Sequence, residues 1–302
     1  MMKALVIGYG SIGRRHAEIL QGMDVISQVT VLSTQDDIPF EKISTLDDII
    51  PLNPHYVVIA SESSMHHDQL CFLEDNMKGK TIFIEKPLFD SYKDLSAHNN
   101  TIFVGYNLRF HPAMQLVKEK VTARKLWHIH VFCGSYLPEW RPGRDYRETY
   151  SAKKNSGGGV LLDLSHELDY VQWLGGSIKP KYVYSNKVSD LEIETDDILV
   201  FDGESAAGAC IHISLNYFTR EPRRQIIIDG EGISIQADLI AKTATVQQDG
   251  ERLEYDWQDF DRNATYKAEH EAILSGNDSD ACTYAEGLET IHLIDTIRKW
   301  TN

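Results

Sequence analysis

The first thirteen residues constrain the fold more than any other part of the chain. Residues 3–7 form a short apolar run, and the sequence GYGSIG follows it at positions 8–13. A G-x-G-x-x-G pattern between a strand and a helix is typical of a turn that binds a dinucleotide pyrophosphate. The first helical N–H groups then face the phosphates. We therefore expect a cofactor site at Gly8, Gly10, Ser11, Ile12 and Gly13, with a purely structural glycine turn as the weaker alternative.

The hydrophobic pattern changes character near residue 105. Before it, apolar runs of strand length alternate with helical patterns, which predicts an α/β domain over 1–105 with a parallel, doubly wound sheet. After it, helices are expected at about 112–121 and 161–174, and strands dominate from 181. Residues 210–217 show the two-residue period of a strand with one buried face. We predict an α+β domain over 106–302 with a mainly antiparallel sheet and a closing helix at about 285–300.

Charge and composition exclude several classes of function. The 30 basic and 45 acidic residues give a net charge of −15, which repels nucleic acid. No apolar run reaches the ~20 residues of a membrane span, and residues 1–10 lack the pattern of a signal peptide. The four cysteines show no C-x-x-C spacing, so neither a metal site nor a disulfide is expected. We expect a cytoplasmic protein without nucleic-acid or membrane partners.

The choice between NAD and NADP depends on the end of the second expected strand. NAD sites usually carry a carboxylate there, about 20 residues after the glycines, for the ribose 2′-hydroxyl. Here the positions hold Ser33 and Thr34, which removes a repulsion against a 2′-phosphate, while Asp36 and Asp37 follow closely. The sequence favours NADP slightly over NAD.

Lys86 is the first candidate for proton transfer. It lies in Glu85-Lys86-Pro87, at the carboxyl end of an expected parallel strand, where such sheets bind ligands. A lysine beside a nicotinamide ring is partly desolvated, which lowers its pKa towards neutrality. The alternative is a surface lysine that pairs with Glu85.

A second candidate group follows three consecutive glycines at 157–159. Glycines permit close approach of a ligand to the backbone. Asp163 and His166 are three residues apart and would share one face of the expected helix. An imidazole oriented by a carboxylate suits proton transfer to or from a sugar hydroxyl. A metal site is not expected, because no third ligand accompanies the pair.

Together these motifs resemble the glucose-fructose oxidoreductase / inositol dehydrogenase / rhizopine-catabolism family, Gfo/Idh/MocA. The matching segments are the glycine turn with Arg15-His16, residues 57–66, the Glu-Lys-Pro sequence at 85–87, and the triple glycine with its Asp and His. The resemblance implies an N-terminal Rossmann domain and a C-terminal domain with a large open-faced sheet. It also implies a homodimer or homotetramer formed through that sheet, and hydride transfer between NAD(P) and a sugar, nucleotide sugar or polyol.

The resemblance assigns roles to individual residues. Lys86 and His166 correspond to the catalytic lysine and histidine. Asp163 corresponds to the catalytic aspartate at a spacing of three where the family usually has four, and Glu167 occupies the fourth position. The proton relay is thus expected among Asp163, His166 and Glu167. The expected cofactor site extends to Ser61, His66, Glu85, Lys86, Trp140 and Arg141.

A loop rich in Arg, Tyr and Trp, residues 135–147, is the expected substrate contact. Arginines bind carboxylates and phosphates bidentately. The candidate substrate residues are Arg109, Arg144, Tyr146 and Glu167, and a self-balanced polar loop is an equal alternative. Two other functions remain open: a glycoside-processing enzyme with an internal redox cycle, and a non-catalytic dinucleotide sensor.

Overall fold

The computed structural model describes residues 1–93, 95–96, 98–154 and 157–300. The chain divides into two compact units. The first comprises Met1–Asn107 and Asn263–Ile291, and the second comprises Leu108–Arg262 and His292–Asn302. Residues 263–291 thus belong to the first unit, whereas the sequence placed them in the second domain. The reason is a helix, α7 (Arg262–Ser275), whose His270 packs edge-on against His16 of the first unit.

The first unit is built on a Rossmann sheet, as predicted. Within the described residues the strand order is β15-β6-β5-β4-β1-β2-β3, and every pair is parallel except β15 with β6. The strands are β1 (Met2–Ile7), β2 (Ile26–Leu32), β3 (Glu41–Ile43), β4 (Tyr56–Ile59), β5 (Thr81–Glu85), β6 (Thr101–Gly105) and β15 (Cys282–Thr283). The central strands β1, β4 and β5 are buried almost throughout, because helices cover both faces.

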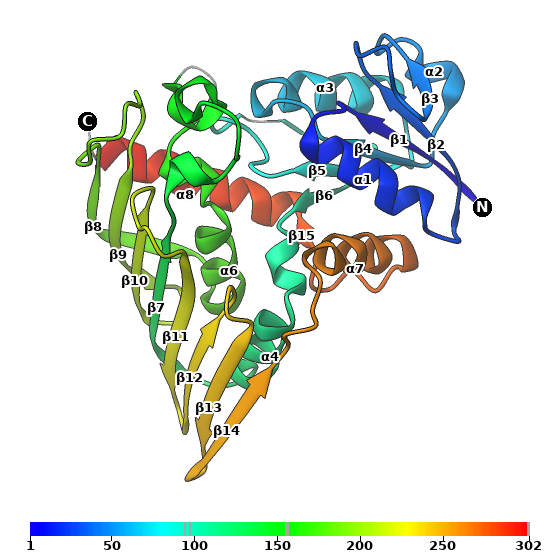
Figure 1. The fold of residues 1–302 in the computed structure, drawn as a ribbon. Coiled ribbons are helices and arrows are strands. Elements are labelled where there is room, and N and C mark those ends of the chain that lie inside the picture. The colour runs from blue at the N-terminus through cyan, green and yellow to red at the C-terminus, as the bar shows by residue number, and fades with distance from the viewer. Residues whose placement is uncertain (94, 97, 155–156, 301–302) are drawn as a thin grey trace. The chain divides into compact units, whose positions relative to one another are not determined.

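Helices pack on both sides of this sheet. They are α1 (Ser11–Gln21), α2 (Ile49–Leu52), α3 (Ser63–Asn76), α7 and the first part of α8 (Tyr284–Trp300). Figure 1 shows α1 and α7 on one face and α3 on the other. Gly287 lets α8 lie against β6, since a Cβ there would be 2.6 Å from Val104.

The second unit contains a mainly antiparallel sheet, also as predicted. Within the described residues it has the order β14-β13-β12-β11-β7-β10-β9-β8, and only β7 and β10 pair in parallel. The strands are β7 (Leu126–Gly134), β8 (Ile178–Asn186), β9 (Ile198–Ser205), β10 (Cys210–Asn216), β11 (Arg223–Gly230), β12 (Ile233–Asp238), β13 (Thr243–Gln248) and β14 (Glu251–Asp256). The turn between β11 and β12 falls on Glu231-Gly232.

The two faces of this sheet differ in chemistry. One face carries buried apolar residues such as Ile129, Ile213 and Ile228, and it contacts α4 (Pro112–Val121), α5 (Val160–Asp163) and α6 (His166–Gly175). The other face carries partly exposed polar residues, including His130 and His212. Figure 1 shows the strands spread side by side from β8 to β14. The two-residue period therefore separates a core face from an open face.

Among the helices of the described residues, none combines the length and the apolar character that crossing a membrane requires.

Candidate active site

The glycine turn between β1 and α1 leaves room above the helix N-terminus. Gly8 has φ +95°, and its N–H donates to the Leu32 carbonyl at 2.9 Å. A Cβ at Gly13 would lie 2.1 Å from the Gly8 carbonyl oxygen, so this glycine is needed for helix packing. At Gly10, by contrast, no atom of the described residues comes within 4 Å of the place a Cβ would occupy. This open backbone and the first turn of α1, which holds no acidic residue, fit a pyrophosphate.

Neutral polar groups surround the end of β2. Ser33 is buried, and its Oγ accepts the Gln35 backbone N–H at 3.1 Å. The Gln35 side chain donates to the Tyr9 carbonyl at 3.1 Å, which connects this loop to the glycine turn. Asp36 is exposed and pairs with Lys42 at 3.3 Å. The ribose end of the expected cofactor site therefore presents hydroxyl and amide groups around Ser33 and Thr34.

His66 connects the loops that follow β4 and β5. Its Nε2 lies 3.2 Å from the Ser61 carbonyl oxygen, and its Nδ1 lies 3.1 Å from the Pro87 carbonyl oxygen. Burial lowers the pKa of His66, so the ring is neutral near pH 7. The Ser61 hydroxyl donates to Gln69 Oε1 at 2.7 Å. The structure thus uses both residues to hold two strand ends in place beside the glycine turn.

Lys86 directly follows the last residue of β5. Glu85 is 8% exposed, and its Oε2 accepts the Lys86 backbone N–H at 3.1 Å. Lys86 itself is partly exposed, and the bond to Pro87 is cis. The strand end therefore places a buried carboxyl and a partly solvated lysine next to each other, at the edge of the sheet where ligands bind.

Asp163 and His166 do not lie on one continuous helix, contrary to expectation. α5 ends at Asp163, Leu164 adopts φ −101° and ψ 32°, and α6 begins at His166. The Asp163 carboxylate accepts the Tyr217 hydroxyl at 2.6 Å, deep in the second unit. Burial, followed by the Asp163 charge, holds the pKa of Tyr217 well above its ordinary value. Tyr217 therefore remains a proton donor to Asp163.

Two of the three glycines before α5, Gly158 and Gly159, make room for other parts of the second unit. A Cβ at Gly158 would lie 2.2 Å from the Tyr150 carbonyl oxygen. Gly159 has φ +115°, and a Cβ there would lie 2.3 Å from Asp196 Oδ1. Asp196 also accepts the Leu161 N–H at 3.1 Å. The close approach at Gly158 and Gly159 is thus made to Tyr150 and Asp196.

Two of the expected substrate residues are held in buried ion pairs. Arg109 is 1% exposed and binds Asp169 through two hydrogen bonds of 3.0 and 2.7 Å. Glu167 is 0% exposed, and its Oε1 accepts from Arg224 Nε at 2.8 Å. The Tyr170 hydroxyl also donates to Glu167 Oε1, at 3.3 Å. Both pairs thus support the interior of the second unit.

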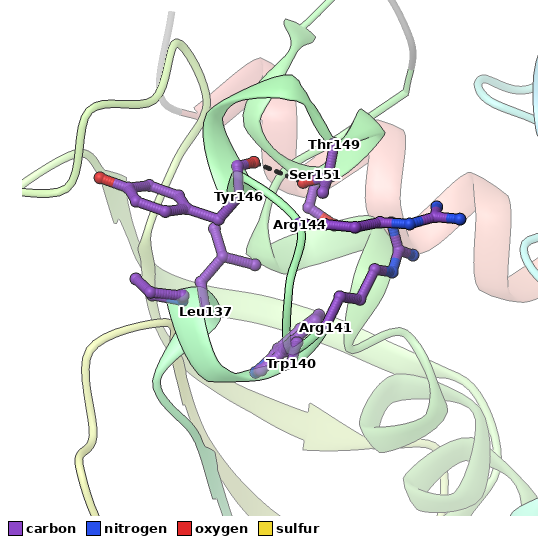
Figure 2. Close-up of a pocket in the computed structure, with 8 residues that line it drawn as sticks. Leu137, Trp140, Arg141, Arg144, Tyr146, Thr149 and Ser151 are labelled. Atoms are coloured by element: carbon purple, nitrogen blue, oxygen red, sulfur yellow. Dashed lines mark hydrogen bonds between the residues drawn. The ribbon is translucent and has the colours of Figure 1, made fainter.

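The aromatic loop that follows β7 surrounds a small cavity (Figure 2). The cavity measures about 10 Å³, near the room one water needs. Trp140 donates to Ser135 at 2.8 Å and stands perpendicular to Tyr217, with ring centres 5.2 Å apart. Arg141 lies over the Tyr150 ring at 4.9 Å.

Arg141 and Arg144 extend to the same side of this loop in Figure 2, and the Tyr146 ring points the other way. The Tyr146 hydroxyl accepts the Glu192 N–H at 3.1 Å. Sequence reasoning missed Tyr217, although it closes the alternating stretch 210–217 and could have been found there.

Comparison with known proteins gives a consistent family. Residues 2–102 match the model of an oxidoreductase family with an NAD-binding Rossmann fold, GFO_IDH_MocA, and residues 114–236 match the GFO/IDH/MocA C-terminal domain. An "Uncharacterized oxidoreductase" of Streptococcus pneumoniae serotype 4 is 23% identical over 292 residues, covering 88% of this chain and 78% of that protein.

Solved structures share the fold across nearly the whole chain. Levoglucosan dehydrogenase in complex with NADH superposes with a TM-score of 0.84 at 17% identity, covering 99% of this chain and 96% of that one. The WlbA dehydrogenase of Bordetella pertussis, in complex with NADH and UDP-GlcNAcA, gives 0.77 at 21% identity, covering 99% and 95%. From the matches to both of its domain models, the chain belongs to the Gfo/Idh/MocA family of NAD-binding oxidoreductases.

Proposed function

We propose that this protein is an NAD-dependent dehydrogenase or reductase that acts on a hydroxyl or ketone of a sugar or nucleotide sugar. The observation that carries the proposal is the first unit's site, where the open glycine turn at Gly10 and the partly exposed Lys86 follow β1 and β5 of one parallel sheet. Two relatives support the substrate class. One is named as a dehydrogenase of levoglucosan, and the WlbA dehydrogenase was solved with UDP-GlcNAcA.

NAD is the cofactor we propose. The family description names NAD, and both structural relatives were solved with NADH, so the slight sequence preference for NADP finds no support. Ser33 and Thr34 would bind the ribose hydroxyls as neutral partners. Affinities for NADH and NADPH measured side by side test this choice, and tighter binding of NADPH would overturn it.

NAD supplies the hydride acceptor when bound, and NADH the donor. In the proposed mechanism Lys86 Nζ exchanges the proton of the reacting hydroxyl, and the His166 imidazole assists this transfer. Asp163 orients the His166 imidazole, and the Tyr217 hydroxyl holds the Asp163 carboxylate at 2.6 Å. Glu167 and Arg109 have structural roles in this proposal, because their charges are satisfied by Arg224 and Asp169.

Arg141 and Arg144 are the proposed contacts for an anionic group, a carboxylate or a phosphate of the substrate. Their side chains extend to the same side of one loop (Figure 2), and guanidinium groups bind such anions in forked geometry. Arg144→Ala should raise KM for a carboxylated or nucleotide-linked sugar and leave KM for a neutral sugar unchanged. Equal effects on both substrate types would remove Arg144 from the site.

The decisive experiment is a panel of neutral, carboxylated and nucleotide-linked sugars with NAD, followed by absorbance of NADH. Lys86→Ala should lower kcat/KM by about 10²–10⁴-fold, measured at saturating NAD, as expected for a positioned acid or base. Product formation without net NADH would favour the internal redox cycle. Tight NAD binding without turnover of any sugar, and with a co-purifying protein, would favour the sensor.

We also propose that two chains pair through the open face of the second unit's sheet. Tyr182, His212 and His130 lie in one row across neighbouring strands of this face, and Tyr182 is 50% exposed. Light scattering tests the oligomeric state. His130→Glu, at the centre of the face, should produce a monomer if this surface is the interface.

A further inference from the structure

Four buried polar side chains form one continuous line in the first unit. Tyr56 of β4 lies 2.7 Å from His270 Nδ1, and His270 Nε2 lies 2.8 Å from His16 Nδ1. His16 Nε2 then lies 2.7 Å from Glu85 Oε1. Tyr56, His16 and His270 are each 0% exposed. Four separate elements, β4, α7, α1 and β5, thus place their polar groups in hydrogen-bonding sequence.

The protons in this line can be ordered in one direction. Burial lowers the pKa of His270 well below its ordinary value, so this ring is neutral. Burial, followed by the Glu269 charge, raises the pKa of Tyr56, so the phenol keeps its proton. Tyr56 then donates to His270, His270 donates through Nε2–H to His16, and His16 donates through Nε2–H to Glu85.

Glu85 is the last acceptor of the line. Its Oε1 faces His16, and its Oε2 accepts the Lys86 backbone N–H at 3.1 Å. A carboxyl that accepts on both oxygens fits the ionised form, since a protonated carboxyl would have to donate from one of them. Hydrogen bonds in such a chain polarise one another in a medium of low dielectric.

We propose that Tyr56, His270 and His16 form a proton-ordered chain that keeps Glu85 ionised and fixed beside Lys86. The three are positioning residues, because the hydrogen bond from His16 to Glu85 connects them to the strand end that carries Lys86. Nothing in the family assignment requires this chain: two of its members, Tyr56 and His270, lie outside every motif that carried the resemblance. The catalytic consequence rests on the proposed role of Lys86, whereas the chain itself does not.

Other charged or titratable groups face this line and belong to its pH response. His66 of α3 is close enough to Glu85 for their charges to interact. From α7, Tyr266 packs edge-on against His16 at 5.7 Å, and Arg15 of α1 lies over the Tyr266 ring. The charge of Glu269, on α7, adds to burial in raising the pKa of Tyr56. Variants for the test should therefore leave these groups intact.

The test uses ¹⁵N spectra of the histidine rings in the full-length protein, without NAD or substrate, over about pH 4 to 9. Signals of His16 and His270 are identified by their loss in His16→Gln and His270→Gln. We expect both rings to be protonated at Nε2 near pH 7, with Nδ1 of each accepting a hydrogen bond. An imidazolium at His270, or an Nδ1–H at His16, would overturn the proposal.

The same spectra show how the donors are coupled, through the tautomer of each ring. Tyr56→Phe removes the first donor at nearly constant volume and should lower the fraction of the Nε2–H tautomer at His270 and, through it, at His16. Phe83→Leu is the matched control, since Phe83 packs on both histidine rings but donates no hydrogen bond. It should lower the melting temperature and leave both tautomer fractions unchanged. Unchanged tautomer fractions in Tyr56→Phe would contradict the chain.

Activity supplies a separate readout. His16→Gln should lower kcat/KM about tenfold with most of the loss in kcat, because Glu85 loses a positioning donor while the substrate contacts remain. If Lys86→Ala keeps full activity, the proposed function fails while the spectra still decide the chain. If the spectra fail while Lys86→Ala is inactive, the chain is refuted and the proposed function stands.

Discussion

The two units bury their polar groups in different ways. In the first unit, the buried line from Tyr56 to Glu85 runs through two histidine rings and ends in a single carboxyl. In the second unit, burial is balanced by pairs of full charges, Arg109 with Asp169 and Arg224 with Glu167. Replacing Tyr56 or His270 in the line removes a hydrogen bond between uncharged side chains. A buried ion pair leaves an uncompensated charge, so the second unit should be the more sensitive to single polar substitutions.

Glycine substitutions give the largest expected effect, and they separate fold from cofactor binding within one motif. Gly13→Ala would place a Cβ 2.1 Å from the Gly8 carbonyl oxygen, against backbone that cannot move away. We expect a loss of roughly 5 kcal/mol in the free energy of unfolding, measured by urea denaturation. Gly10→Ala is the matched control, because the described residues leave that position open and its φ is −72°.

Gly10→Ala should therefore keep wild-type stability and weaken NAD binding at least about tenfold, because the methyl group occupies the approach of the pyrophosphate. Calorimetric titration with NADH measures this loss. Wild-type NADH affinity in a folded Gly10→Ala protein would show that the cofactor does not approach this turn.

Sequence reasoning reached the first unit more completely than the second. The strand and helix alternation and the glycine turn are local patterns, so the Rossmann sheet and its ligand-binding edge could be foreseen. The partners of Asp163, Glu167 and Arg109 lie 54, 57 and 60 residues away along the chain, at Tyr217, Arg224 and Asp169. No local pattern encodes such pairings, because they depend on how strands and helices pack.

The break between α5 and α6 was missed for a related reason. Residues 161–174 have an uninterrupted helical pattern of apolar side chains, without a proline or glycine before Gly175. The interruption at Leu164 arises where α5 is anchored, as Asp196 accepts the Leu161 N–H and Tyr217 binds Asp163. Tertiary contacts thus override the local helix preference.

Arg109→Met tests the buried ion pair directly. It leaves the Asp169 carboxylate, about 2% exposed, without its guanidinium partner. We expect a loss of about 3–5 kcal/mol in the free energy of unfolding. The double variant Arg109→Met with Asp169→Leu should recover most of this loss, because no buried charge remains. A single variant that costs no more than the double would show that the pair is not what makes the second unit sensitive.

Replacing Asp196 gives the smallest predicted change in the free energy of unfolding. Unlike replacing a member of an ion pair, it should increase stability near neutral pH. Burial raises the pKa of Asp196 to about 6, against about 3.9 in the unfolded chain. The folded state therefore holds a proton that the unfolded state releases, so stability present below about pH 4 is lost as the pH rises to about 6. The expected loss is about 3 kcal/mol over that interval, at 1.36 kcal/mol for each unit of pKa.

Asp196→Asn keeps the carbonyl that accepts the Leu161 N–H and cannot ionise. Relative to wild type, it should gain stability steadily between about pH 4 and 6 and show no further gain above that range. Urea denaturation at intervals across this window measures the difference between the two curves. The exposed Asp190→Asn is the control, because this carboxyl is solvated in the folded and unfolded states and its replacement should leave the curve unchanged. If Asp196→Asn runs parallel to wild type, the carboxyl is solvated or paired in the folded protein, and the second unit then balances all its buried acids as it balances Asp169 and Glu167.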